Sequence, residues 1–231
     1  MRRPRLADER GFTLPELLVA MAIGMIVLLA AFMVLDRSFT ASGQVADRSD
    51  ALQRGRQAME LMTRQLRSQV CVGTTNPPIV AGTPNSITFY VDLGDGTEPI
   101  QRRTLTYNPA TDTIMESVVK AAGTYPNLTF TSPATTKPLL TKVEPILEAN
   151  NTERPIFRYY QYKVGGAPGE LEQLGVPLTT TTRRRVSAMK IGFRSFADRE
   201  FTNDENAVVL EDDVYVRMAV PTQLQGAVEC F

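Results

Sequence analysis

The sequence contains no histidine and no tryptophan, and it has only two cysteines. Without histidine, the chain cannot build a Ser-His-Asp or Cys-His catalytic apparatus or a zinc site with histidine ligands. Two cysteines are too few for a four-thiolate metal site. Acid–base chemistry on carboxylates alone stays formally open. We therefore expect no enzymatic activity, no metal and no other cofactor.

An excess of charge is missing as well, because 25 Lys and Arg residues balance 25 Asp and Glu residues. Nothing in this balance suggests a chain built to coat nucleic acid. The length of 231 residues suits one domain of ordinary size with an appended segment.

Charge is also absent from a long apolar run, Leu17 to Leu35 (LLVAMAIGMIVLLAAFMVL). As a helix this run would span about 28 Å, close to the thickness of a bilayer core. The segment before it carries Arg2, Arg3, Arg5 and Arg10 against Asp8 and Glu9. By the positive-inside rule, we expect a cytoplasmic N-terminus and an exported remainder, which makes a single-pass membrane protein.

Two ordinary interpretations account for part of this segment. A cleaved secretory signal usually has an apolar region of about 7–15 residues and a small-x-small cleavage site. Here the run is longer, and Leu29-Ala30-Ala31-Phe32 is a poor site. A plain signal anchor explains the length but not Gly11 or Glu16. A carboxylate beside hydrocarbon costs on the order of 2–3 kcal/mol unless it is paired or lies at headgroup level.

The stretch Gly11-Phe12-Thr13-Leu14-Pro15-Glu16, followed by the apolar run, resembles the N-terminal signature of type IV pilins and type II secretion pseudopilins. The resemblance implies that a prepilin peptidase cleaves between Gly11 and Phe12, and that Phe12 is then N-methylated. The apolar helix would anchor the subunit in the membrane and later pack with other pilin or pseudopilin subunits in a filament, assisted by an inner-membrane assembly platform.

The same resemblance gives Glu16 a purpose. Its carboxylate would pair with the Phe12 ammonium of an adjacent subunit, because an unpaired charge is costly in a medium of low dielectric constant. Pro15 departs from the family, in which many members carry an aliphatic residue. Proline is tolerated in a first helical turn, where its missing N–H would be unsatisfied anyway.

Beyond the apolar run, apolar residues continue on one helical face. They are Val45, Leu52, Met59, Met62, Leu66 and Val70. We therefore predict one long helix from Leu14 to Val70, apolar in its first half and amphipathic in its second. Two helices with a break near Ser42-Gly43 are the alternative, since Gly43 and Gly55 permit bending.

After Cys71 the composition becomes typical of strands and turns. The predicted strands are Ile87–Leu93, Arg102–Tyr107, Asp112–Val119, Pro155–Val164, Arg185–Phe196 and Val208–Val220, and Leu139–Leu147 is a strand or a short helix. The fold class is α+β, with the long helix packed on an antiparallel sheet. The expected divisions are a leader (1–11), the helix (12–70, spanning the membrane at 17–35) and an extracytoplasmic head (71–231). The strand order loosely resembles the heads of minor pilins.

Cys71 and Cys230 lie 159 residues apart, near the two ends of the expected head. In an exported domain such a pair favours a disulfide. Closing so long a loop would stabilise the head by about 4–5 kcal/mol. The alternative is two free or intermolecular thiols.

Two other clusters of charged residues support weaker hypotheses. Asp92, Asp95 and Glu98 resemble part of a calcium loop, but their spacing does not match an EF-hand. Arg183-Arg184-Arg185 is read as a solvated strand edge or loop, with a phosphate or DNA contact as the alternative.

The sequence therefore predicts a minor pilin or minor pseudopilin that works as a structural subunit of an extracytoplasmic filament. An adhesive or DNA-binding tip subunit, a plain signal-anchored exported protein and a membrane-anchored enzyme with carboxylate catalysis remain as alternatives.

Overall fold

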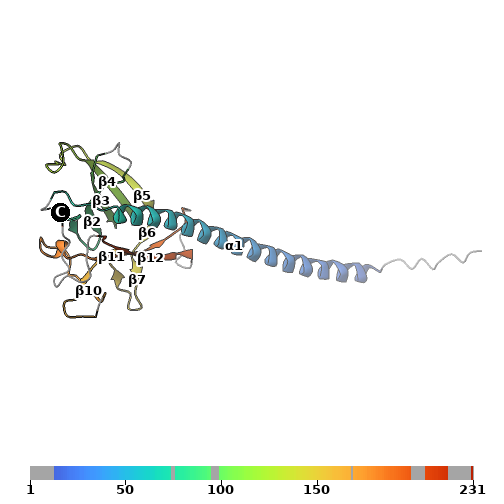
Figure 1. Ribbon diagram of the computed structural model, residues 1–231. Helices are drawn as coiled ribbons and strands as arrows, with labels where there is room; N and C mark the ends of the chain where they lie inside the picture. Colours follow the sequence, from blue (N-terminus) through green and yellow to red (C-terminus); the bar gives the residue numbers. More distant parts are fainter. Residues whose placement is uncertain are drawn as a thin grey trace, which may run out of the picture. The chain divides into compact units, whose positions relative to one another are not determined.

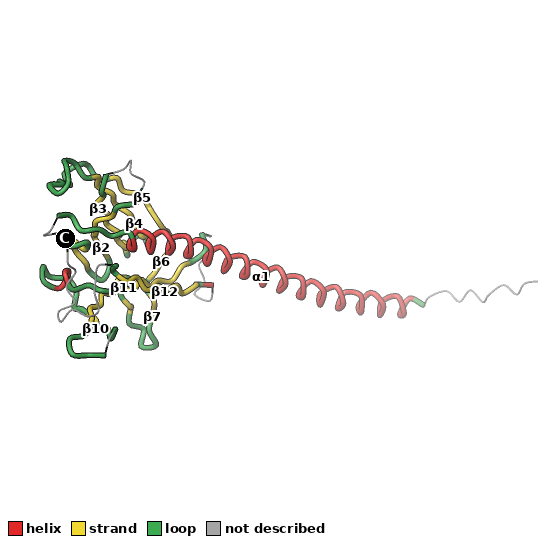
Figure 2. Tube along the Cα trace, viewed as in Figure 1, coloured by secondary structure: helices red, strands yellow, loops and turns green. Residues whose placement is uncertain are grey.

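The computed structural model describes residues 13–73, 76–94, 99–167, 169–198, 206–217 and 230. Helix α1 (Leu14–Arg67) comes first, and antiparallel strands follow (Figures 1 and 2). The strands are β1 (Ile79–Gly82), β2 (Ser86–Val91), β3 (Gln101–Asn108), β4 (Thr113–Lys120), β5 (Thr135–Thr141), β6 (Val143–Glu144), β7 (Ile146–Leu147), β8 (Glu153–Arg154), β9 (Phe157–Tyr162), β10 (Leu171–Gln173), β11 (Ala188–Ser195) and β12 (Val208–Tyr215). A 3-10 helix, η1 (Thr182–Arg184), precedes β11.

Helix α1 is one continuous element that passes through Gly43 and Gly55 without a break. It ends at Arg67, three residues before the predicted end at Val70. The backbone of the next residues pairs with β2 instead: Val70 N donates to Tyr90 O (3.1 Å), and Asp92 N donates to Ser68 O (3.2 Å). Residue contacts divide the chain into two compact units, Met1–Ala46 and Asp47–Phe231.

The strands of the second unit form two five-stranded sheets and a two-stranded ribbon. The first sheet is a meander in the order β1-β2-β3-β4-β5. The second has the order β10-β9-β11-β12, and β6 also pairs with β11. The predicted α+β class with antiparallel strands is confirmed, while the single sheet that we expected is divided into two.

The predicted strands correspond to β2, β3, β4, β9, β11 and β12 with shifts at their ends. The range Leu139–Leu147 is neither one strand nor a helix, because Lys142 has a positive φ of 57° and separates β5 from β6. The first residues of Arg185–Phe196 are not strand, since Arg185 caps η1. The predicted strand Val208–Val220 was too long, because β12 ends at Tyr215 and neither Val216 nor Arg217 is strand; positions 218–220 and the turn at Asp95-Gly96 lie outside the described residues.

The C-terminal part of α1 contacts both sheets of its unit. Ser195 on β11 donates to Ala51 O (2.9 Å), and Arg54 donates to the backbone oxygen of Thr141 on β5 (3.2 Å). Met59, Met62 and Leu66 are buried as predicted, whereas Val45 is 70% exposed. The rest of the buried face consists largely of small residues, Ala51, Gly55 and Ala58. Small side chains let the helix approach the strands closely.

Tyr159 on β9 joins the two sheets. Its hydroxyl shares its one hydrogen between Ser86 O (2.9 Å) and Thr83 O (3.2 Å), which flank the turn between β1 and β2. Burial raises the pKa of the Tyr159 hydroxyl well above its ordinary value. The hydroxyl therefore stays protonated and remains a donor at physiological pH.

Replacing Gly55 by alanine is expected to lower the free energy of unfolding by up to about 2 kcal/mol. The added Cβ would clash with Leu210 Cδ1 and would lie 3.0 Å from Ser195 Cβ. Leu210 can rotate away, but Ser195 is fully buried in a central strand. Overpacking costs about 1–3 kcal/mol, partly offset by about 1 kcal/mol of helix propensity. Urea denaturation followed by tyrosine fluorescence measures the change.

Gly43→Ala is the matched control, because nothing lies within 4 Å of the Cβ it would add. This variant is expected to leave the unfolding of the second unit unchanged. Equal unfolding curves for Gly55→Ala and the wild type would contradict close packing at Gly55.

Candidate functional site

The first turn of α1 contains the described part of the predicted signature. Leu17 N donates to Thr13 O (3.1 Å), so the helical hydrogen bonds begin at Thr13. Pro15 lies in this turn, where it removes no helical bond. Glu16 is the acidic residue of the same turn. Gly11 and Phe12, the residues of the predicted cleavage and methylation, lie outside the described residues.

The environment of Glu16 offers two physical accounts. No described residue forms an ion pair with it, and the next charged residue along the chain is Asp36. A carboxylate in the first turn of a helix is stabilised by the positive end of the helix dipole. Thr13 and Glu16 also have the spacing of a capping box, in which the acidic side chain accepts a bond from the N-cap N–H. Local capping and pairing with another chain therefore have to be separated by experiment.

The apolar run of α1 is not a buried core helix of this chain. From Leu17 to Leu35 every residue is exposed, and no part of the apolar window is buried. Among the described residues, α1 is the helix that is long and apolar enough to cross a membrane. So much exposed apolar surface is stable only in lipid or against other apolar helices.

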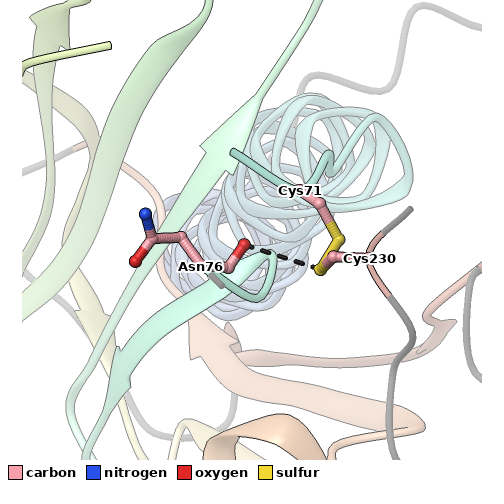
Figure 3. Close-up of a disulfide and its surroundings, with 3 residues drawn as sticks. All are labelled: Cys71, Asn76 and Cys230. Atoms are coloured by element: carbon pink, nitrogen blue, oxygen red, sulfur yellow. Dashed lines mark hydrogen bonds between the residues drawn. A yellow bond between two sulfur atoms is a disulfide. The ribbon is translucent and has the colours of Figure 1, made fainter. Parts of the chain in front are cut away.

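The structure brings Cys71 and Cys230 together in a disulfide, with their Cα atoms 5.6 Å apart (Figure 3). Cys71 lies four residues after the end of α1. Cys230 Sγ also lies 3.6 Å from the backbone oxygen of Asn76. Both cysteines pack against the hydrophobic core. The bond therefore fastens the C-terminal end of the chain to the segment that follows the helix.

The arginine run lies in the connection before β11 and beside the edge strand β1, as predicted, but it is half-buried and not solvated. Arg183 and Arg184 lie in η1, and all three arginines are half-buried. Arg183 Nη1 donates to Val80 O on β1 (3.0 Å). This hydrogen bond from Arg183 holds η1 against the edge of the sheet. The structure therefore adds no support for a DNA contact at this run.

The acidic turn after β2 is described only in part. Asp92 Oδ1 accepts a bond from Gly94 N (2.9 Å), which is the geometry of an Asx turn. Asp95 and Glu98 lie outside the described residues. Within the part of the chain that the structure describes, no group of three or more His, Cys, Asp or Glu side chains could hold a metal ion.

Comparison with known proteins identifies the same N-terminal segment. A family model described as the prokaryotic N-terminal methylation motif matches residues 6–32. The match includes Gly11, Phe12, Glu16 and most of the apolar run. A search of curated proteins finds no match. The segment is therefore a prepilin-type signature of the kind found in type IV pilins and pseudopilins, as its residues predicted.

Proposed function

We propose that this chain, which carries a prepilin-type signature, is a structural subunit of a type IV pilus or a type II secretion-like filament. Prepilin peptidase cleaves it after Gly11, and Phe12 becomes the methylated N-terminus. The strongest support is that three features occur together in one segment. The methylation motif covers the start of α1, which carries a carboxylate in its first turn and an exposed apolar run. Its role is structural rather than enzymatic.

Charge and the disulfide support the proposed arrangement across the membrane. The arginines before Gly11 keep the leader in the cytoplasm. The Cys71–Cys230 bond suits an oxidising extracytoplasmic compartment. The chain is first anchored by α1 and then transferred into the filament with the help of an inner-membrane assembly platform. We assign it as a minor subunit because of its large β-rich head.

The N-terminus of the membrane-extracted protein tests this function. Mass spectrometry is performed with and without a co-expressed prepilin peptidase. A start at Phe12 that depends on the peptidase, with or without an added methyl group, is the expected result. A start at Met1 in both cases would leave a plain signal anchor.

Glu16→Gln and Glu16→Ala are both expected to lower the fraction of the subunit in purified filaments by more than about tenfold. An uncompensated charge costs on the order of 2–3 kcal/mol in an apolar environment, so the Phe12 ammonium needs its partner. Glutamine keeps an acceptor for the capping bond to Thr13 but removes the charge. Immunoblots of sheared filaments against whole cells measure the fraction.

Asp36→Asn is the control, because it removes a carboxylate from the other end of the apolar run and should leave incorporation unchanged. Wild-type incorporation of Glu16→Gln together with failure of Glu16→Ala would show that Glu16 acts as a helix cap and not as an ion-pair partner.

A further inference from the structure

A groove of about 640 Å³ lies between the C-terminal part of α1 and strand β12. Its cationic side chains are Arg56, Arg64 and Arg67 of α1 and Arg217, which follows β12. Met59, which is buried, and Leu210, which is half-buried, add apolar surface. The groove therefore combines basic and apolar side chains in one concave site.

The charges of this groove are not balanced. Glu60 and Asp212 also line the groove. Because these two carboxylates face four arginines, the groove keeps an excess of two positive charges. Asp212 already accepts a hydrogen bond from Thr63 Oγ1 (3.0 Å). Such an excess stands out in a chain whose formal net charge is zero.

The four guanidinium groups also differ from other arginines of the fold. No hydrogen bond or ion pair joins any of them to a described residue, and all four residues are exposed. Arg54, Arg103 and Arg158, in contrast, each pair with a carboxylate of the same chain. The donors in the groove are therefore available to another molecule.

The chemistry of the groove favours a peptide over a nucleic acid. A guanidinium fork binds a carboxylate through two parallel hydrogen bonds, and Met and Arg are enriched at protein interfaces. Among the described residues that line the groove, none carries an aromatic ring that could stack on a nucleobase. The volume accommodates a few side chains but not a duplex.

The spacing of the arginines indicates a pattern of residues in the ligand. Arg56 and Arg64 are eight residues apart in α1, which places them about 12 Å apart along the helix axis. In an extended peptide, residues i and i+4 lie on the same side and about 13 Å apart. The residue between them, i+2, faces the same way, toward the part of the groove that Met59 and Glu60 line.

We infer that the groove binds an extended acidic segment of a neighbouring subunit, with carboxylates at i and i+4 and an apolar side chain at i+2. The inference rests on the proposed function and adds the chemistry of one of its partners. Arg56 and Arg64 bind the two carboxylates. Arg67 and Arg217 add to the positive electrostatic potential of the groove.

The full chain in detergent micelles is tested with a fluorescein-labelled peptide that contains Glu-Ser-Leu-Ser-Glu, by fluorescence anisotropy. We expect binding that weakens with added salt. Arg64→Glu should weaken it by about tenfold or more. Arg48→Glu makes the same change of charge at an exposed position of α1 outside the groove and should change the affinity by less than about twofold. A Gln-Ser-Leu-Ser-Gln peptide should not bind.

Three results would overturn the inference: no binding by the wild type, equal loss in Arg64→Glu and Arg48→Glu, or tighter binding of a 20-base-pair DNA duplex that Arg64→Glu abolishes. The last would identify a nucleic acid as the ligand. The outcome is independent of the N-terminal measurement. Processing at Phe12 without peptide binding would remove the groove inference alone. Peptide binding with a start at Met1 would remove the filament function, and with it the neighbouring subunit as the source of the acidic segment.

Discussion

Replacing Cys71 and Cys230 together by serine is expected to lower the free energy of unfolding by about 4–5 kcal/mol. The disulfide closes a loop of 159 residues, so it restricts most of the unfolded head. Its loss restores that conformational freedom to the unfolded chain. It also releases Cys230 from its place beside the core.

Urea denaturation of the full chain in detergent, followed by tyrosine fluorescence, measures this loss. The chain has seven tyrosines and no tryptophan, so tyrosine emission reports on the head without interference. Wild-type protein treated with a reductant should unfold as the double serine variant does. The reductant should have no effect on that variant. Identical unfolding of reduced and oxidised wild type would show that the bond contributes nothing to stability.

Replacing Glu116 by leucine is expected to lower the free energy of unfolding by about 3–5 kcal/mol. Its carboxylate is fully buried on β4. Oε1 accepts bonds from Gln65 Nε2 of α1 (2.6 Å) and Arg103 Nη1 of β3 (2.7 Å), and Oε2 lies 3.1 Å from Lys137 Nζ of β5. Removing Glu116 leaves the Arg103 guanidinium, only 11% exposed, without its counter-charge.

Two further variants separate the buried charge from the surface one. Lys137→Ala should cost about 0–1 kcal/mol, because the Lys137 side chain is 61% exposed and water replaces the pair. Arg103→Leu combined with Glu116→Leu should cost less than the sum of the two single changes, since neither charge is then left alone. Additive losses would contradict a coupled ion pair at this position.

The elements that sequence reasoning found share one property: their signals are local. Each predicted strand alternates or concentrates β-branched residues within a few positions, and the structure has β2, β3, β4, β9, β11 and β12 there. The short strands β1, β8 and β10 were missed, since two to four residues carry too little pattern. The end of α1 was placed too late, because the pairing of Val70 with Tyr90 is a contact between segments 20 residues apart.

The candidate functional residues also separate into those with a local sequence signal and those without one. Gly11, Phe12, Glu16 and the apolar run form one contiguous pattern, and the match at residues 6–32 covers it. The arginine groove was not predicted. Arg56, Arg64 and Arg67 were visible only as the polar face of a helix, and nothing local connects them to Arg217.

The sequence alone therefore determined the membrane-capable helix, the prepilin signature and the α+β class, because each depends on the order and polarity of neighbouring residues. With two cysteines in the whole chain, it also left a single possible internal disulfide. Only the tertiary structure decided the roles of Gly55 and Glu116 and the existence of the arginine groove. Gly55 is small because Leu210 and Ser195 approach it, and Glu116 is tolerated because Gln65, Arg103 and Lys137 surround it. Such roles arise when distant segments are packed together, and no local pattern encodes them.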